Sequence, residues 1–200
     1  MYGMAHRALR QMMIDRLGLA AWVKVERETG TGPADLISLC VYDDSKTVAL
    51  IAASAEQLGL PMDQALQVFG RYWVRYAELS SFGPIMDFTG QDLVTFINNL
   101  DRMHRSVVLA MPDARVPSFT LLEEANGYLL VRYKSDRTGL ETFVTGLLEG
   151  LMDRLGESGT VQVADRDGNT IDFSIRLDRG PVDAVPTDTA LLDTVQLATR

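Results

Sequence analysis

The sequence predicts an α+β fold, in which an N-terminal helical part is followed by antiparallel hairpins and a packed helix. Up to Met111, apolar side chains recur at the three- and four-residue spacing of helices that bury one face. From Phe119 onward the spacing changes to two, and the pair Asn126-Gly127 is typical of a tight hairpin turn. Helices that precede a run of hairpins, rather than alternating with single strands, favour α+β over a parallel α/β sheet.

Five helices are expected before Pro112, which stops the last one because proline cannot continue the helical hydrogen bonding. Glycines end several of them, Asp63 is expected to cap the fourth, and Thr89 with Asp92 forms an approximate capping box for the fifth. The segment Ser80–Pro84 is interpreted as a break between these two. The expected helices span Met1–Leu17, Ala20–Glu28, Asp44 or Ser45 to Leu58, a segment after Asp63 that includes Leu66 and Tyr76, and a segment from about Asp92 to Met111.

The remainder of the chain predicts two hairpins separated by a helix. Strand segments alternate apolar and polar residues, and turn residues divide them. The expected elements are a strand from Phe119 that returns as Tyr128–Lys134, a helix over Leu140–Leu155, and a hairpin of Thr160–Ala164 with Thr170–Leu177.

The composition is that of one soluble domain with a short tail. The 200 residues include 19 basic and 27 acidic side chains, and the net charge of −8 argues against electrostatic binding of nucleic acid or of an anionic membrane. Cys40 is the only cysteine, which excludes intrachain disulfides and thiolate-clustered metal centres. It is expected to be a buried small hydrophobe, and an exposed thiol open to redox or nitrosation chemistry is the alternative. We find no signal peptide and no membrane-spanning stretch, and therefore expect a cytoplasmic protein with a domain over residues 1–180 and a tail over residues 181–200.

The two histidines, His6 and His104, limit any imidazole chemistry to two places. His104 lies in the apolar stripe of the fifth helix, four residues after Leu100 and three before Val107, so it is expected to face the core. A buried neutral imidazole needs a hydrogen bond or a metal. The helix alone does not separate a hydrogen-bonded core histidine, which is the commoner case, from a ligand. His6, beside Arg7 near the chain start, is expected to be exposed.

Three hydrogen-bond donors alternate at the end of the Tyr128–Lys134 strand. On an extended backbone Tyr133, Ser135 and Arg137 project from one face, where they offer a phenol, a hydroxyl and a guanidinium. This set suits carboxylates, although the solvated edge of a sheet also carries such residues. A buried histidine together with a carboxylate-binding strand meets the needs of a haem, which requires an axial nitrogen and partners for two propionates.

Six short motifs occur in one order along the chain. They are Met1-Tyr2-Gly3, Phe69-Gly70-Arg71-Tyr72-Trp73, Asn99-Leu100-Asp101-Arg102-Met103-His104, Pro117-Ser118-Phe119, Tyr133-x-Ser135-x-Arg137 and Gly146-Leu147-Leu148-Glu149-Gly150. In this order and approximate spacing they resemble the H-NOX (haem–nitric oxide/oxygen binding) family, which includes the haem domain of soluble guanylate cyclases and bacterial stand-alone gas sensors. Each motif is common by chance, but the ordered set is specific, and the resemblance covers about residues 1–180.

The resemblance implies a haem b (iron protoporphyrin IX) bound between the helical part and the hairpins. His104 would ligate the iron through a neutral imidazole nitrogen. The propionates would be bound by Tyr133, Ser135 and Arg137, and Pro117 would press on the macrocycle.

The resemblance also bears on the gas. In oxygen-binding members of the family a tyrosine on the helix after the propionate motif donates a hydrogen bond to the bound oxygen. The matching residue here is Phe143, or Thr142 if the register differs by one, and Trp73 occupies a second distal position. We therefore expect an apolar distal pocket and nitric oxide, together with carbon monoxide, as the ligand. Trp73 or Thr142 could still donate, so an oxygen sensor is the alternative, and core packing alone would also account for Trp73 and Phe143.

The resemblance further implies that nitric oxide releases His104 from the iron and that a separate partner, such as a histidine kinase or a cyclic-di-GMP enzyme, detects the change. The chain is not expected to be an enzyme, because it has no phosphate-binding loop, dinucleotide glycine motif, zinc-protease motif or nucleophile elbow. A haem-free scaffold that binds a partner is a second alternative. Retention of His104 and of the three strand donors argues against it.

Overall fold

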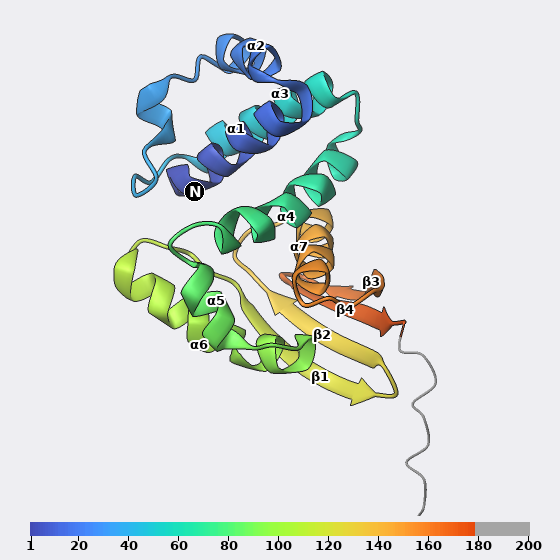
Figure 1. The fold of residues 1–200 in the computed structure, drawn as a ribbon. Helices are drawn as coiled ribbons and strands as arrows, with labels where there is room; N and C mark the ends of the chain where they lie inside the picture. Colours follow the sequence, from blue (N-terminus) through green and yellow to red (C-terminus); the bar gives the residue numbers. More distant parts are fainter. Residues whose placement is uncertain (179–200) are drawn as a thin grey trace, which may run out of the picture.

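The computed structural model describes residues 1–178, so the expected tail over residues 181–200 lies outside the described residues. Figure 1 shows α1, α2 and α3 grouped on one side, α4 and α7 in the middle, and a sheet with α5 and α6 on the other side. The helices are α1 (Gly3–Leu17), α2 (Leu19–Thr29), the short 3₁₀ helix η1 (Pro33–Leu36), α3 (Asp44–Leu58), α4 (Met62–Glu78), α5 (Gly83–Thr89), α6 (Leu93–Ala110) and α7 (Glu141–Arg154). The predicted α+β class is confirmed. Among the described residues, no helix is both long and apolar enough to cross a membrane.

The strands form one antiparallel sheet in the order β1-β2-β4-β3, and they are β1 (Ser118–Ala125), β2 (Tyr128–Lys134), β3 (Gly159–Asp167) and β4 (Thr170–Leu177). Asn126 and Gly127 have φ values of 48° and 77°, the left-handed conformation that a two-residue hairpin turn requires. Both predicted hairpins are therefore confirmed. Their second strands, β2 and β4, pair with each other, with Tyr133 opposite Ile171 at the centre of the sheet.

The core consists of two apolar clusters, and α4 contributes to both. Leu66 and Phe69 belong to the cluster of the N-terminal helices, whereas Val74 and Ala77 belong to the cluster above the sheet. We call α1, α2 and α3, on one side of α4, the N-terminal part. The elements on its other side, which are α5, α6, α7 and the sheet, are the C-terminal part. One helix therefore connects the packing of both parts, and any space between them lies beside it.

Helices α4 and α7 cross with their backbones in contact. A Cβ atom on Gly146 would lie 2.0 Å from the carbonyl oxygen of Gln67, and one on Gly70 would lie 2.1 Å from that of Phe143. Only glycine allows such an approach without displacing a helix. The crossing therefore fixes α7 against α4 where the two parts meet.

Besides the short η1, one α-helix was not predicted. Helix α5 begins at Gly83, inside the segment Ser80–Pro84 that was expected to be a break. Pro84 lies in its first turn, where the missing backbone N–H costs nothing because no earlier carbonyl would accept it.

Two capping assignments were also wrong. Pro61 precedes α4, and Asp63 lies inside the first turn of that helix rather than at its cap. Asp92 is itself the N-cap of α6, and its carboxylate accepts a hydrogen bond of 2.8 Å from the backbone N–H of Thr95. Thr89, expected in the capping box, ends α5 instead.

Cys40 was expected to be buried and is exposed, in the segment before α3. Its backbone carbonyl accepts a hydrogen bond of 2.9 Å from the N–H of Gly3. Pairing of the backbone with the chain start therefore holds this segment in place, although the cysteine itself is exposed.

Candidate functional site

A cavity of about 690 Å³ lies where the two parts meet, which is within the size range of cofactor sites. Its lining comes from α1, α4, α5, α6, α7 and the start of the sheet, and is mostly apolar. All seven predicted site residues line this one cavity: Trp73, His104, Pro117, Tyr133, Ser135, Arg137 and Phe143. Residues from six separate elements and loops thus converge on a single space.

His104, on α6, presents one free ring nitrogen. Its Nδ1 lies 2.9 Å from the carbonyl oxygen of Pro117. A carbonyl can only accept, so Nδ1 carries the proton and Nε2 carries the lone pair. Nε2 makes no hydrogen bond to any residue that the structure describes. Burial lowers the pKa of His104, so the imidazole is held in the neutral form that binds metals.

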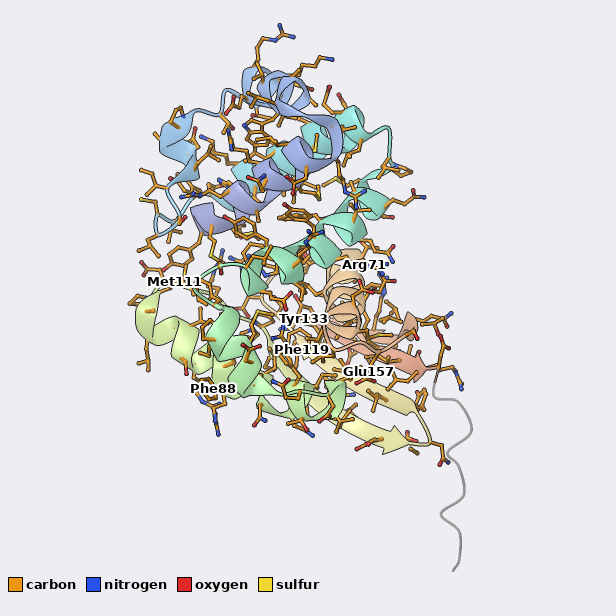
Figure 2. The ribbon with its side chains drawn as sticks, viewed as in Figure 1. Arg71, Phe88, Met111, Phe119, Tyr133 and Glu157 are labelled. Atoms are coloured by element: carbon orange, nitrogen blue, oxygen red, sulfur yellow. The ribbon has the colours of Figure 1, made fainter. Side chains whose placement is uncertain are left out.

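A second contact ties the beginning of the sheet to α6. Asp101, one turn before His104, accepts a hydrogen bond of 2.8 Å from the backbone N–H of Phe119. The Phe119 ring lies between the rings of His104 and Tyr133, at centroid distances of 6.2 Å and 5.3 Å. Figure 2 shows Phe119 and Tyr133 close together between the sheet and the helices. The orientation of the imidazole therefore depends on β1 as well as on its own helix.

The three strand donors lie together at another part of the cavity wall. Tyr133 is 3 % exposed, and burial raises the pKa of its phenol, so the hydroxyl stays protonated and able to donate. The hydroxyl of Ser135 accepts from the backbone N–H of Arg137 at 3.1 Å. Arg137 donates from Nη1 to the carbonyl oxygen of Arg115 at 2.8 Å. A phenol, a hydroxyl and a guanidinium therefore line one space, and the last two are tied to each other and to Arg115.

Another part of the cavity wall is aromatic. Phe143 on α7 and Trp73 on α4 pack around Phe69, with ring centroids 5.4 Å and 6.3 Å from it. Ala5 on α1 also lines the cavity, whereas Thr142 does not. Since α7 contains no tyrosine, this wall carries no phenol from that helix.

These groups fit a haem. The cavity supplies apolar walls for a macrocycle, one neutral imidazole with a free nitrogen for the iron, and charged and hydroxyl donors for two carboxylates. Each of these requirements is met by residues of this chain that line the cavity.

Comparison with known proteins agrees with this donor set. The model of the family described as haem-NO-binding matches residues 2–163. The chain belongs to the haem-NO-binding family.

Curated relatives of this family member are soluble guanylate cyclases. Soluble guanylate cyclase gcy-35 of Caenorhabditis elegans is 26 % identical over 167 residues, a match that covers 80 % of this chain and 24 % of the relative. Guanylate cyclase soluble subunit beta-2 of Rattus norvegicus is 34 % identical over 90 residues, covering 45 % of this chain and 13 % of the relative. The chain thus spans about a quarter or less of the length of these cyclases.

Solved structures of H-NOX proteins share the fold. The H-NOX protein of S. oneidensis in its Fe(II)NO state superposes with a TM-score of 0.78 at 17 % identity, covering 90 % of this chain and all of that one. An oxygen-binding H-NOX domain related to soluble guanylate cyclases, solved as its oxygen complex, gives a TM-score of 0.74 at 20 % identity, covering 90 % of this chain and 96 % of that one. The architecture is therefore that of H-NOX domains.

Asp44, at the start of α3, is a member of the site that the sequence analysis missed. Its carboxylate accepts from the amino group of Met1 at 2.8 Å, from Arg115 at 2.8 Å and from Nε of Arg137 at 3.1 Å. The amino group of Met1 first, and then Arg137, lower the pKa of Asp44 to about 2, against the opposing effect of burial. One carboxylate faces three cations here, so this part of the cavity wall has positive charge to spare for an anionic ligand.

His6 is the clearest correction. It was expected to be exposed, but its side chain is wholly buried in the N-terminal part. Nδ1 donates to the carbonyl oxygen of Asp35 at 2.9 Å, and Nε2 accepts from the hydroxyl of Thr47 at 2.8 Å. Both nitrogens have partners and His6 does not line the cavity, so it serves the fold rather than the site.

Proposed function

We propose that this chain is a sensor of nitric oxide, which holds a ferrous haem b between its two parts and signals to a separate protein. The observation that carries the proposal is the free Nε2 of His104 in the same cavity as the donors Tyr133, Ser135 and Arg137. His104 would hold the iron of a haem bound there, and the iron would supply the chemistry that binds a diatomic gas.

The residues of the chain then have distinct roles. His104 is the iron ligand, and the Pro117 carbonyl keeps the proton on Nδ1 and the ring in one orientation. Tyr133, Ser135 and Arg137 bind the propionates through hydrogen bonds and charge. Pro117, in the cavity wall, presses on the macrocycle.

The distal wall supports nitric oxide as the signal, with carbon monoxide as a second ligand. Bound oxygen carries partial negative charge and is stabilised by a nearby donor, whereas nitric oxide does not need one. Phe143 and Ala5 offer no donor. An oxygen sensor is the second candidate, because the indole N–H of Trp73, which also lines the cavity, could supply one.

We propose further that nitric oxide releases His104 from the iron and that the resulting shift of α6 is detected by a partner, such as a histidine kinase or a cyclic-di-GMP enzyme. A ligand can act in this way when it favours one of two arrangements of the same element. The proposed role is sensory, with any catalysis on the partner.

The test is an absorption spectrum of the reduced protein without oxygen, recorded before and after nitric oxide is added. We expect a red protein. After nitric oxide is added, its Soret band should move to the wavelength that is typical of a nitrosyl haem without a histidine ligand. A stable oxygen complex in air would instead make oxygen the signal. Colourless, folded protein from haem-replete cells would favour the haem-free scaffold.

A further inference from the structure

Arg154, the last residue of α7, is a buried charge outside the cavity. Its side chain is only 7 % exposed. Nη2 donates to the carboxylate of Asp87 on α5, and Nε lies 3.4 Å from a carboxylate oxygen of Glu78 at the end of α4. The guanidinium also lies 6.0 Å from the centre of the Phe96 ring on α6. One side chain of α7 thus contacts three other helices.

The arginine depends on these contacts more than its two carboxylate partners do. Glu78 and Asp87 are 41 % and 66 % exposed, so either carboxylate can return to water if the contact is lost. The guanidinium cannot, because burial of an unpaired charge is costly. Arg154 therefore keeps both carboxylates, and the helices that carry them, against the end of α7.

A second contact from the same region reaches the beginning of α6. Glu157, in the loop after α7, accepts a hydrogen bond of 3.0 Å from the backbone N–H of Leu93, the first residue of α6. Figure 2 shows Glu157 near the end of α7. This carboxylate accepts from a helix N–H that has no partner within the helix. Its negative charge is also stabilised by the positive end of the helix dipole.

The packing of α6 is uneven along its length. Its buried residues are Leu93, Phe96, Ile97 and Leu100, and all of them precede His104. After His104, Leu109 is 86 % exposed. His104 thus lies where a half of the helix that packs against the core passes into a half that borders the cavity, at Val107, and solvent, at Leu109.

We propose that Arg154, supported by Glu157, is a positioning residue for His104. It fastens α5 and the first half of α6 to α7, so that a displacement of His104 is confined to the second half of α6. This inference rests on the proposed function, because it concerns the helix that carries the iron ligand. It adds to that function that the first half of α6 stays fixed while the second half moves.

The test compares R154M, which keeps the length of the side chain without its charge, with R71M as a matched control. Arg71 on α4 also forms an ion pair at the end of α7, with Asp153. The side chains of this pair are 56 % and 49 % exposed, unlike that of Arg154. In haem-free protein, R154M should speed amide hydrogen exchange in α5 and in residues 93–100 by about tenfold or more, whereas R71M should not.

The second readout is the iron–histidine stretching band of the ferrous protein, measured by resonance Raman spectroscopy. It should shift in R154M, because a loosened helix lets the imidazole follow the iron, and R71M should keep the wild-type band. D87N leaves Glu78 to pair with Arg154, so it should fold and give a smaller shift in the same direction.

An unchanged band in R154M and D87N would overturn the proposal, even with faster exchange, since Arg154 would then only stabilise the fold. Unchanged exchange in R154M would overturn it as well. If the wild-type protein gives no iron–histidine band, the proposed function fails instead, and exchange in haem-free protein still shows whether Arg154 fastens α5 and α6.

Discussion

The two histidines lie in different parts of the molecule and have nearly the same first contact. In each, Nδ1 is 2.9 Å from a backbone carbonyl oxygen, that of Asp35 for His6 and that of Pro117 for His104. In each, burial lowers the pKa. They differ at Nε2, which contacts Thr47 in His6 and no described residue in His104. A candidate ligand is therefore recognised by its unused lone pair rather than by its burial.

The surroundings of the two residues differ in the same sense. His6 is enclosed by the N-terminal part, where the Tyr42 ring lies 5.1 Å from its own. His104 is half-buried, with its open side toward the cavity. The first environment offers complete hydrogen bonding and no space, and the second offers space and an incomplete set of partners.

The largest expected effect separates the two residues by their spectra. His104→Gly should abolish protein ligation of the iron, and added imidazole should restore the spectrum of ferrous protein by filling the space left. His6→Gln, away from the cavity, should leave that spectrum unchanged. If His104→Gly keeps the wild-type spectrum without imidazole, the comparison assigns the ligand wrongly.

Stability of the haem-free protein should rank the two residues in the opposite order. His6→Ala removes a fully buried ring and leaves Thr47 and the Asp35 carbonyl without partners, so the free energy of unfolding should fall by about 3 kcal/mol. His104→Ala removes one hydrogen bond from a half-buried side chain and should cost about 1 kcal/mol. Urea denaturation measures both, and equal losses would contradict the distinction drawn between them.

The smallest effect is a dependence of stability on pH. Burial, followed by the nearby amino group and Lys46, lowers the pKa of His6 below 6.5, against the opposing hydrogen bond to Asp35. The unfolded chain therefore binds a proton that the folded chain refuses, and stability decreases as the pH falls below about 6.5, at no more than about 1.4 kcal/mol per pH unit for one group. Urea denaturation of haem-free His6→Gln should show a shallower decrease, and an unchanged slope would exclude His6 as a source.

The fold was predictable where its signals are local. The Asn126-Gly127 turn and the alternation in β2 specify a hairpin within a few residues, and the helical spacing around His104 places it on the inner side of α6. The two-residue period predicted one face for Tyr133, Ser135 and Arg137, and all three line the cavity, although Ser135 and Arg137 lie after the end of β2. Each of these depends on neighbours in the sequence.

The errors concern partners that are distant along the chain. The contacts of His6 come from residues 29 and 41 positions away, and those of Asp44 with Arg115 and Arg137 span 71 and 93 positions. No periodicity carries such information, so His6 was expected to be exposed and Asp44 was not considered. Helix α5 was missed for a different reason, since its glycine and proline resemble a turn.

The exposed thiol of Cys40 offers a practical opportunity. It is the single cysteine among 200 residues, so a maleimide dye would attach at one position without any prior replacement of other thiols. That position pairs with Gly3 at the start of α1 and precedes Asp44 in the chain, although Cys40 itself does not line the cavity. A fluorophore there would report, by its brightness, how the N-terminal helices respond when a coloured ligand enters or changes state.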